Sequence, residues 1–94
     1  MMNEKQKEDV LKRLNKVEGQ IRGINKMVTE DRYCIDILTQ TRAVVSAIRK
    51  VEELIMKQHL YSCVTTSMRS NNEEDKANKI NEVMDMLSRF RHVG

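Results

Sequence analysis

The chain has 94 residues, 17 Lys plus Arg against 14 Asp plus Glu, and a formal net charge of +3 at pH 7. It contains no proline, no tryptophan and three glycines, so it lacks the frequent turn residues of β-sandwiches and β-barrels. No apolar run reaches the ~18 residues of a membrane span. The polar N-terminus carries no signal-peptide core, and Rossmann and P-loop fingerprints are absent.

These features predict one all-helical domain over residues 1–94, located in the cytoplasm and without a membrane partner. The sequence contains no internal repeat and no low-complexity segment. Because a chain this small buries a low fraction of its own surface, we expect it to oligomerise.

A heptad pattern of apolar residues predicts a first helix over residues 4–28. Gly19 and Gly23 lie four residues apart on one side of it, and close packing against a neighbouring helix explains them better than a phosphate-binding role. Thr29 or Asp31 is placed to cap the helix that follows. The heptad positions are Val10, Leu14, Val17, Ile21, Ile24 and Val28.

A second helix is predicted over residues 31–68, and it is unusually long because no Gly, Pro or Asn interrupts it. Its apolar residues cover a broad face, which indicates burial against more than one partner. The small residues Ala43, Ser46 and Ala47 lie near its middle. They would allow two such helices to cross closely.

A loop is predicted at residues 68–72, after which Asn72 caps a third helix. Acidic residues follow the cap directly and would interact favourably with the positive end of the helix dipole. The apolar residues of this helix repeat at helical spacing as far as Phe90. They are Ala77, Ile80, Val83 or Met84, Leu87 and Phe90.

His59 and Cys63 are the first candidate metal ligands. They lie four residues apart, so a helix presents both on one face. Imidazole nitrogen and thiolate sulfur together suit Cu(I), Zn(II) or iron. The pair alone does not establish a metal site, because free cysteines are often simply buried and a single histidine is often an ordinary surface residue.

Cys34 strengthens the metal interpretation. It lies 29 residues before Cys63, or ~43 Å along an unbroken helix at ~1.5 Å per residue, so the two thiols cannot meet within one chain. They can meet between chains if two copies of the second helix pack antiparallel and cross near residues 47–48. This geometry predicts an intersubunit site in which Cys34 of one chain joins His59 and Cys63 of the other. Three such ligands fit trigonal Cu(I), whereas structural Zn(II) would require a fourth; a disulfide is disfavoured in the reducing cytosol.

Basic residues suggest a nucleic-acid partner. A charge of +3 per chain becomes about +12 in a tetramer, enough to attract DNA phosphates. The alternative is an ordinary solvated surface of amphipathic helices. Neither a helix-turn-helix nor an aromatic stacking platform is visible, so any DNA contact would come from the faces of long helices. The candidates from charge are Lys16, Arg22, Arg42 and Arg49.

Three stretches of the chain resemble the CsoR/RcnR family of metal-sensing repressors. They are KRLNKVEGQIRGI at residues 12–24, EDRYCIDILTQ at residues 30–40 and QHLYSCV at residues 58–64, and the resemblance extends over about residues 8–90. It implies an antiparallel helical-bundle dimer that assembles into a tetramer. It also implies repression of transcription through operator DNA, without a conventional DNA-binding motif and without enzymatic activity.

The resemblance assigns roles to individual residues. The family's sensing ligands match Cys34, His59 and Cys63, the pattern of the copper-sensing branch. In that branch the apo repressor binds operator DNA, and Cu(I), one per subunit at an intersubunit site, releases it and derepresses copper-resistance genes. The residues that adjust the ligand histidine match Tyr33 and Glu82, and would orient the imidazole through its second nitrogen.

The family's DNA-contacting positions match Arg13 and Lys50. Nickel/cobalt and formaldehyde sensors use a residue near the N-terminus and usually a histidine at the position of Cys63, and this chain has neither feature. Persulfide sensors keep both cysteines but lack the histidine that His59 supplies, so a sulfur-sensing repressor is the alternative reading within the family. Outside it, a helical adaptor with buried cysteines would bind neither metal nor DNA. A Cys–His nucleophile lacks a visible substrate pocket or oxyanion device.

Overall fold

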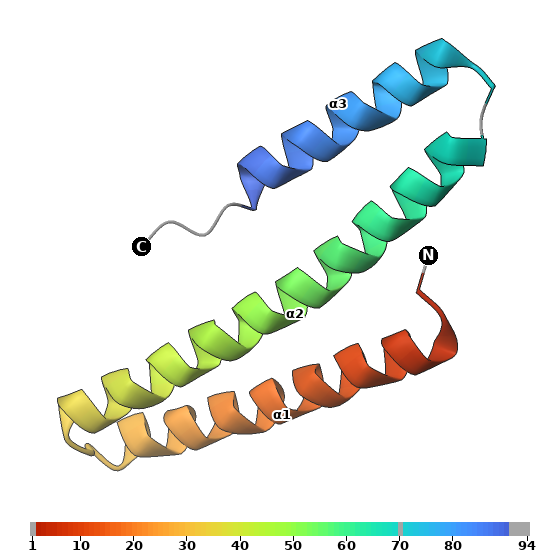
Figure 1. The fold of residues 1–94 in the computed structure, drawn as a ribbon. Helices are drawn as coiled ribbons and strands as arrows, with labels where there is room; N and C mark the ends of the chain where they lie inside the picture. Colours follow the sequence, from red (N-terminus) through yellow and green to blue (C-terminus); the bar gives the residue numbers. More distant parts are fainter. Residues whose placement is uncertain (1, 70, 91–94) are drawn as a thin grey trace. The chain divides into compact units, whose positions relative to one another are not determined.

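The computed structural model describes residues 2–69 and 71–90, which form three α-helices (Figure 1). They are α1 (Glu4–Thr29), α2 (Cys34–Arg69) and α3 (Glu73–Arg89). The described residues contain no strand, so the all-α class with three helices is confirmed. Among these helices none is both long enough and apolar enough to cross a membrane.

The chain divides into two compact units, and the boundary falls inside α2. The first unit, Met2–Ile55, contains α1 and the first part of α2. The second begins at Met56 and contains the rest of α2 together with α3. Within each unit the two helical segments run antiparallel, side by side (Figure 1).

The start of α1 is fixed by a reciprocal cap. Asn3 Oδ1 accepts a hydrogen bond from the Gln6 backbone N–H at 2.8 Å, and Gln6 Oε1 accepts one from the Asn3 N–H at 2.9 Å. This capping box satisfies two donors that a helix start leaves without partners. The predicted start at Glu4 is confirmed, and the helix runs one residue beyond the predicted Val28.

The turn after α1 corrects the predicted start of α2. The Arg32 N–H donates to the Met27 carbonyl at 2.9 Å and the Asp31 N–H to the Val28 carbonyl at 3.1 Å, the two bonds of a Schellman motif. Asp31 lies in the left-handed region with φ 54°, so it ends α1 and cannot open the next helix.

The expected cap of α2 at Thr29 or Asp31 was therefore wrong. Thr29 is the last residue of α1, and its hydroxyl donates to the Asn25 carbonyl within that helix at 2.9 Å. Instead, α2 begins at Cys34. Tyr33 precedes it, and its carbonyl accepts from the N–H groups of Asp36 and Ile37 at 3.0 and 3.2 Å.

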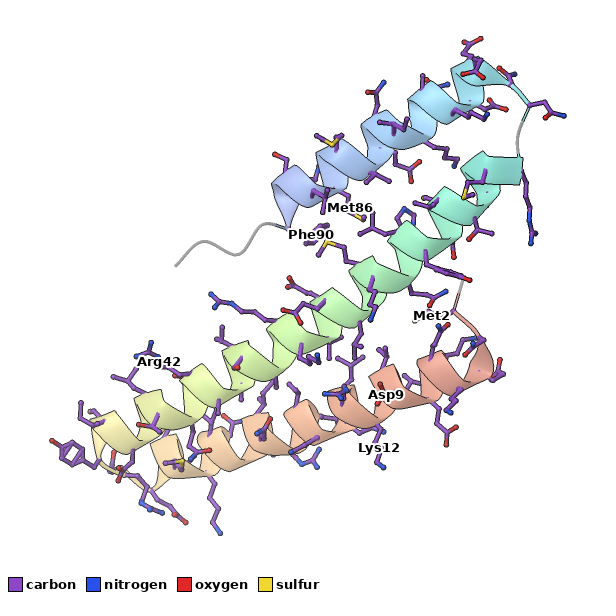
Figure 2. All side chains as sticks on the ribbon, in the orientation of Figure 1. Met2, Asp9, Lys12, Arg42, Met86 and Phe90 are labelled. Carbon is purple, nitrogen blue, oxygen red and sulfur yellow. The ribbon has the colours of Figure 1, made fainter. Side chains whose placement is uncertain are left out.

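The long second helix and the cap of the third are confirmed. α2 runs through 36 residues. Asn72 Oδ1 accepts from the backbone N–H of Glu74 at 2.9 Å and of Asp75 at 3.4 Å, so α3 starts where the sequence places it. Met86 and Phe90 lie on the side of α3 that faces α2 (Figure 2).

Only half of the predicted heptad seam is covered within the chain. Val10 and Val17 are buried, with Val51 of α2 in the same unit, whereas Ile21 and Val28 are 49% and 56% exposed. α1 thus packs one edge of its apolar stripe against α2 and leaves the other edge open. A single chain consequently leaves apolar surface uncovered, as expected for a protein that needs further copies of itself.

The two helical glycines do not pack against a neighbouring helix of the same chain. Apart from the backbone of α1 and the adjacent residues, a methyl group built on Gly23 would meet no described atom within 4 Å, and one on Gly19 would meet the end of the Arg22 side chain at 3.7 Å. The predicted close packing is therefore not found within one chain, because this side of α1 faces away from the described part of α2.

Candidate metal centre

His59 and Cys63 lie one turn apart on the second part of α2 and touch each other. Cys63 Sγ is 3.4 Å from His59 Nε2. Cys63 is buried, with 6% of its surface exposed, and the His59 side chain is 23% exposed. The four-residue spacing puts them on one helix face, as predicted, and the packing of α3 against this face shields the thiol.

Glu82 reaches the same imidazole from α3. Its Oε1 atom lies 3.1 Å from His59 Nε2, and the contact joins residues 23 positions apart in the chain. One potential ligand atom from each of His59, Cys63 and Glu82 falls within 4.8 Å of the other two. The structure therefore gathers a nitrogen, a sulfur and an oxygen donor from one protomer at one place.

The contacts of the imidazole with Glu82 and with Cys63 involve the same nitrogen. The family resemblance predicts that Glu82 contacts the nitrogen of His59 that does not face the metal, yet Nε2 faces both Glu82 and Cys63. A ring nitrogen that carries a proton can donate to the carboxylate, and one that does not can accept from the thiol. Nε2 is thus the atom at which the three side chains converge.

Lys79 holds the other oxygen of Glu82. Its Nζ atom lies 3.6 Å from Glu82 Oε2, three residues along α3. The carboxylate therefore presents Oε1 to His59 and Oε2 to the ammonium group. Lys79 is not among the residues predicted from the sequence, although the spacing of three residues between a lysine and a glutamate on a helix is the signal that could have identified it.

An apolar groove adjoins the buried thiol. It lies between the second part of α2 and α3, has a volume of about 360 Å³, and is lined by Cys63, Val64, Ile80, Val83 and Met84 among others. Val64 and Met84 are more than half exposed. Cys63 thus meets apolar side chains on one side and polar groups on the other.

Cys34 and Tyr33 belong to the first unit and are not part of this donor group. Cys34 is the first residue of α2 and is exposed. Tyr33, directly before it, is 67% exposed. Leu38 and Val45, four and eleven residues after Cys34 and on the same helix face, are 55% and 51% exposed. The face that carries Cys34 is therefore an open, partly apolar surface of the protomer.

The candidate DNA-contacting residues all lie in the first unit and fall into two groups. Three of them form ion pairs within their own helix, namely Arg13 with Asp9 at 3.3 Å, Arg22 with Glu18 at 3.0 Å and Lys50 with Glu53 at 3.8 Å. Such exposed pairs are weak and open readily. Lys16, Arg42 and Arg49 have no ion pair among residues 2–69 and 71–90.

Cationic side chains project from both outer sides of the helical hairpin in the first unit. Arg42 points away from α1, and Lys12 points away from α2 (Figure 2). Both are exposed. Exposed positive charge therefore lies on the outer face of α1 and on the outer face of the first part of α2.

Comparison with known proteins gives one family and several relatives. A family model described as "metal-sensitive transcriptional repressor" matches residues 6–89. The copper-sensing transcriptional repressor RicR of Mycobacterium tuberculosis is 52% identical over 63 residues, which are 67% of this chain and 66% of that protein. The copper-sensing transcriptional repressor CsoR of Bacillus subtilis is 38% identical over 86 residues, or 92% of this chain and 82% of that protein.

Two solved structures have a similar fold. The Cu(I)-containing repressor CsoR of Geobacillus thermodenitrificans superimposes with a TM-score of 0.82 at 36% identity, covering 98% of this chain and 93% of that chain. The nickel-responsive transcriptional regulator InrS gives a TM-score of 0.74 at 35% identity, covering 88% of this chain and 90% of that chain. The similarity therefore extends over nearly the whole chain and includes regulators that respond to different metals.

Proposed function

The chain belongs to the family of metal-sensitive transcriptional repressors, and from this membership we propose that it is a Cu(I)-responsive repressor. It binds operator DNA without Cu(I), releases it when Cu(I) binds, and so derepresses copper-resistance genes. The observation that carries the proposal is the buried Cys63 thiol 3.4 Å from His59 Nε2, in a chain similar to a Cu(I)-containing repressor. We place this activity in the cytoplasm, where thiols stay reduced.

The available donors suit Cu(I). His59 and Cys63 supply an imidazole nitrogen and a sulfur from one protomer, and Cys34 of the partner subunit supplies a second sulfur. Thiolate and imidazole are the ligands that Cu(I) favours, and three of them complete a trigonal site. We expect one Cu(I) per subunit.

Two features support a site shared between subunits. The 29-residue spacing of Cys34 and Cys63 is about eight turns at ~3.6 residues per turn, so a helix presents both thiols on one face. On that face Leu38 and Val45 are more than half exposed, and they would be covered if α2 paired antiparallel with α2 of a second copy. We propose such a dimer as the unit from which a tetramer assembles.

Operator binding is assigned to the outer faces of α1 and α2. Arg13, Lys16 and Lys50 are exposed there, and phosphate contacts would replace the weak pairs that Arg13 and Lys50 make within their helices. We also keep Arg22, Arg42 and Arg49 among the proposed contacts.

His59 is the residue through which Cu(I) binding is coupled to DNA release. Glu82 contacts it from α3 at 3.1 Å, and Tyr33 lies beside Cys34, so ligand rearrangement at His59 would move or stiffen the helices that carry them. By thermodynamic linkage, DNA must weaken Cu(I) binding by the same factor by which Cu(I) weakens DNA binding, typically ~1–3 kcal/mol.

The test is an anaerobic Cu(I) titration of the reduced protein, with fluorescence anisotropy of an operator fragment recorded in parallel. Binding of one Cu(I) per chain together with loss of DNA binding is the expected result. Cys34→Ser should abolish the release. DNA binding that ignores Cu(I) but is lost with a persulfide donor, through a Cys34–Cys63 bridge between subunits, would identify a sulfur sensor and refute the copper proposal.

A further inference from the structure

One protomer holds a complete set of three donors that does not include Cys34. The set consists of His59 Nε2, Cys63 Sγ and a carboxylate oxygen of Glu82, all within 4.8 Å of one another. It differs in chemistry from the Cu(I) set proposed above, because an oxygen replaces the second sulfur. Carboxylate oxygen is a poor ligand for Cu(I) and an ordinary one for Zn(II).

We propose that His59, Cys63 and Glu82 of a single protomer form a Zn(II) site, with water as the fourth ligand. Tetrahedral Zn(II) with ordinary bond lengths separates N from S by about 3.5 Å and N from O by about 3.4 Å. The observed separations are 3.4 Å for Nε2 to Sγ and 3.1 Å for Nε2 to Oε1. The two separations from Nε2 are thus within a few tenths of an ångström of the required values before any ion binds, and Sγ and the carboxylate oxygen lie within 4.8 Å of each other.

The position of Nε2 explains how one imidazole serves this site. Nε2 faces both Sγ and Oε1, so a cation bound to Nε2 lies between them. Binding requires neutral His59 with its proton on Nδ1, and the Cys63 thiol releases its proton to solvent as the thiolate binds. Both changes are ordinary steps of Zn(II) uptake by protein ligands.

Lys79 orients the carboxylate for this role. It holds Glu82 Oε2 at 3.6 Å, which leaves Oε1 directed at His59. Lys76 is a matched reference on the same helix, because it makes the same type of pair with Glu73, three residues away at 3.7 Å, and Glu73 lies in the first turn of α3 outside the donor group. Lys79 is therefore a positioning residue, and Lys76 is not.

The Zn(II) site and the Cu(I) site share His59 and Cys63 but differ in their third protein ligand, so each metal would bind a different donor set. Zn(II) takes Glu82 from the same protomer and has no need of Cys34 of the partner subunit. Cu(I) binds the partner subunit's Cys34 and does not use Glu82 as a ligand. On the premise of the proposed function, only the second set links two subunits, so Zn(II) occupies the site while the operator stays bound.

The experiment is a Zn(II) titration of the reduced full-length protein against a chromophoric chelator. Co(II) serves as a second probe, because its absorption reports thiolate ligation. We expect Cys34→Ser to bind Zn(II) like the unaltered protein and Glu82→Gln to bind at least about tenfold more weakly. Asp85→Asn is the control for Glu82→Gln, since Asp85 is an exposed α3 carboxylate that pairs with Arg89 and lies outside the donor group. Cys63→Ser should remove the thiolate-to-cobalt absorption.

The two lysines provide a second comparison. We expect Lys79→Met to weaken Zn(II) binding by about twofold to fivefold, the range of an exposed ion pair, and Lys76→Met to leave it unchanged. Equal effects of the two substitutions would overturn the orienting role of Lys79.

Three results would overturn the zinc site. They are no Zn(II) uptake by the unaltered protein, unaltered affinity in Glu82→Gln, and loss of Zn(II) binding in Cys34→Ser. None of them depends on Cu(I), whose titration tests the proposed function separately. The affinity for the operator, measured by anisotropy, should change less than about twofold with saturating Zn(II) and at least about fivefold with Cu(I). Release of the operator by Zn(II) would overturn the discrimination between the two sets.

Discussion

At the scale of single residues, the chemistry of this protein converges on one imidazole nitrogen. His59 Nε2 lies 3.4 Å from the Cys63 thiol and 3.1 Å from the Glu82 carboxylate. An imidazole that contacts both a soft sulfur donor and a hard oxygen donor can share a metal ion with either one. The type of ion that binds then decides which of the two becomes the second ligand. Under the proposed function, His59 would have two tasks: it would bind the metal and would transmit metal binding to α3.

The first prediction separates these two tasks. His59→Ala should still bind Cu(I) through the two thiolates, because thiolates are the stronger Cu(I) ligands. It should lose most of the coupling, so that saturating Cu(I) changes operator affinity by less than about twofold, where the unaltered protein changes it at least fivefold. Operator anisotropy with and without Cu(I) measures this. Thr66→Ala, an exposed change on the same helix, is the control, and a normal response of His59→Ala would refute the coupling model.

At the scale of helices, the starts of α1 and α3 are set by side chains, whereas the end of α1 and the start of α2 are set by the backbone. Asn3 and Asn72 cap α1 and α3 through their side-chain oxygens. By contrast, Asp31 in the left-handed conformation ends α1, and α2 starts three residues later than its pattern predicts. The cap of α3 bears on the proposed function, because α3 carries Glu82, which contacts His59.

The second prediction concerns that cap. Asn72→Ala removes the acceptor for two backbone N–H groups of α3 and should lower the free energy of unfolding by about 1 kcal/mol. This corresponds to a fall of roughly 4–8 °C in the unfolding midpoint of a domain this size, measured by circular dichroism. Asn71→Ala, the adjacent exposed asparagine, should change the midpoint by less than 2 °C, or about a quarter of that effect. Equal shifts in both variants would show that the cap does not stabilise the protein.

The third prediction uses the open side of α1. Apart from the backbone of α1 and the adjacent residues, a methyl group at Gly23 meets no described atom within 4 Å, and alanine stabilises a helix interior by about 1 kcal/mol relative to glycine. Gly23→Ala should therefore raise the thermal midpoint of the protein without DNA. A fall in the midpoint would mean that another protomer packs against this glycine, and a loss of operator affinity alone would mean that DNA does.

At the scale of the whole molecule, a single chain leaves much of its apolar surface exposed. Its buried apolar residues are Val10, Val17, Val51 and Cys63 among those described, while leucines, isoleucines and valines on α1 and α2 remain about half exposed. Covering one such side chain contributes about 1.5–3 kcal/mol. Association between copies is the direct way for this chain to gain that free energy.

The fourth prediction tests the proposed interface. Leu38→Glu places a charge on the exposed face that carries Cys34, and should shift the protein toward monomers in sedimentation velocity because burying an unpaired charge is costly. It should also weaken Cu(I) binding, which depends on the partner's cysteine. Thr39→Glu adds the same charge one residue away at an exposed position and should leave the assembly intact; identical behaviour of the two variants would refute the interface.

The fifth prediction concerns DNA. Lys16 is exposed and has no ion pair within the described ranges, so Lys16→Ala removes a cation available to phosphate. The slope of log affinity against log salt should fall in magnitude by at least about 1. Lys76→Ala removes the same charge from α3 and should leave the slope unchanged. The assignment of Lys16 fails if the two slopes fall equally.

The sequence determined the features of this protein that depend on near neighbours. Helical periodicity predicted three helices, the uninterrupted α2 and the capping role of Asn72, because each results from interactions over a few residues. The same periodicity placed His59 and Cys63 on one face. The family resemblance drawn from three short stretches is confirmed by a match over residues 6–89.

The tertiary structure decided what depends on distant residues. Helical spacing within α3 can suggest the Lys79–Glu82 pair, but it cannot show that Glu82 meets His59 Nε2 across 23 positions. It also cannot tell which edge of the heptad stripe is covered, since both edges are equally apolar. The physical reason is that a helix fixes the directions of its side chains by local hydrogen bonds, whereas the packing of one helix on another selects which of them meet.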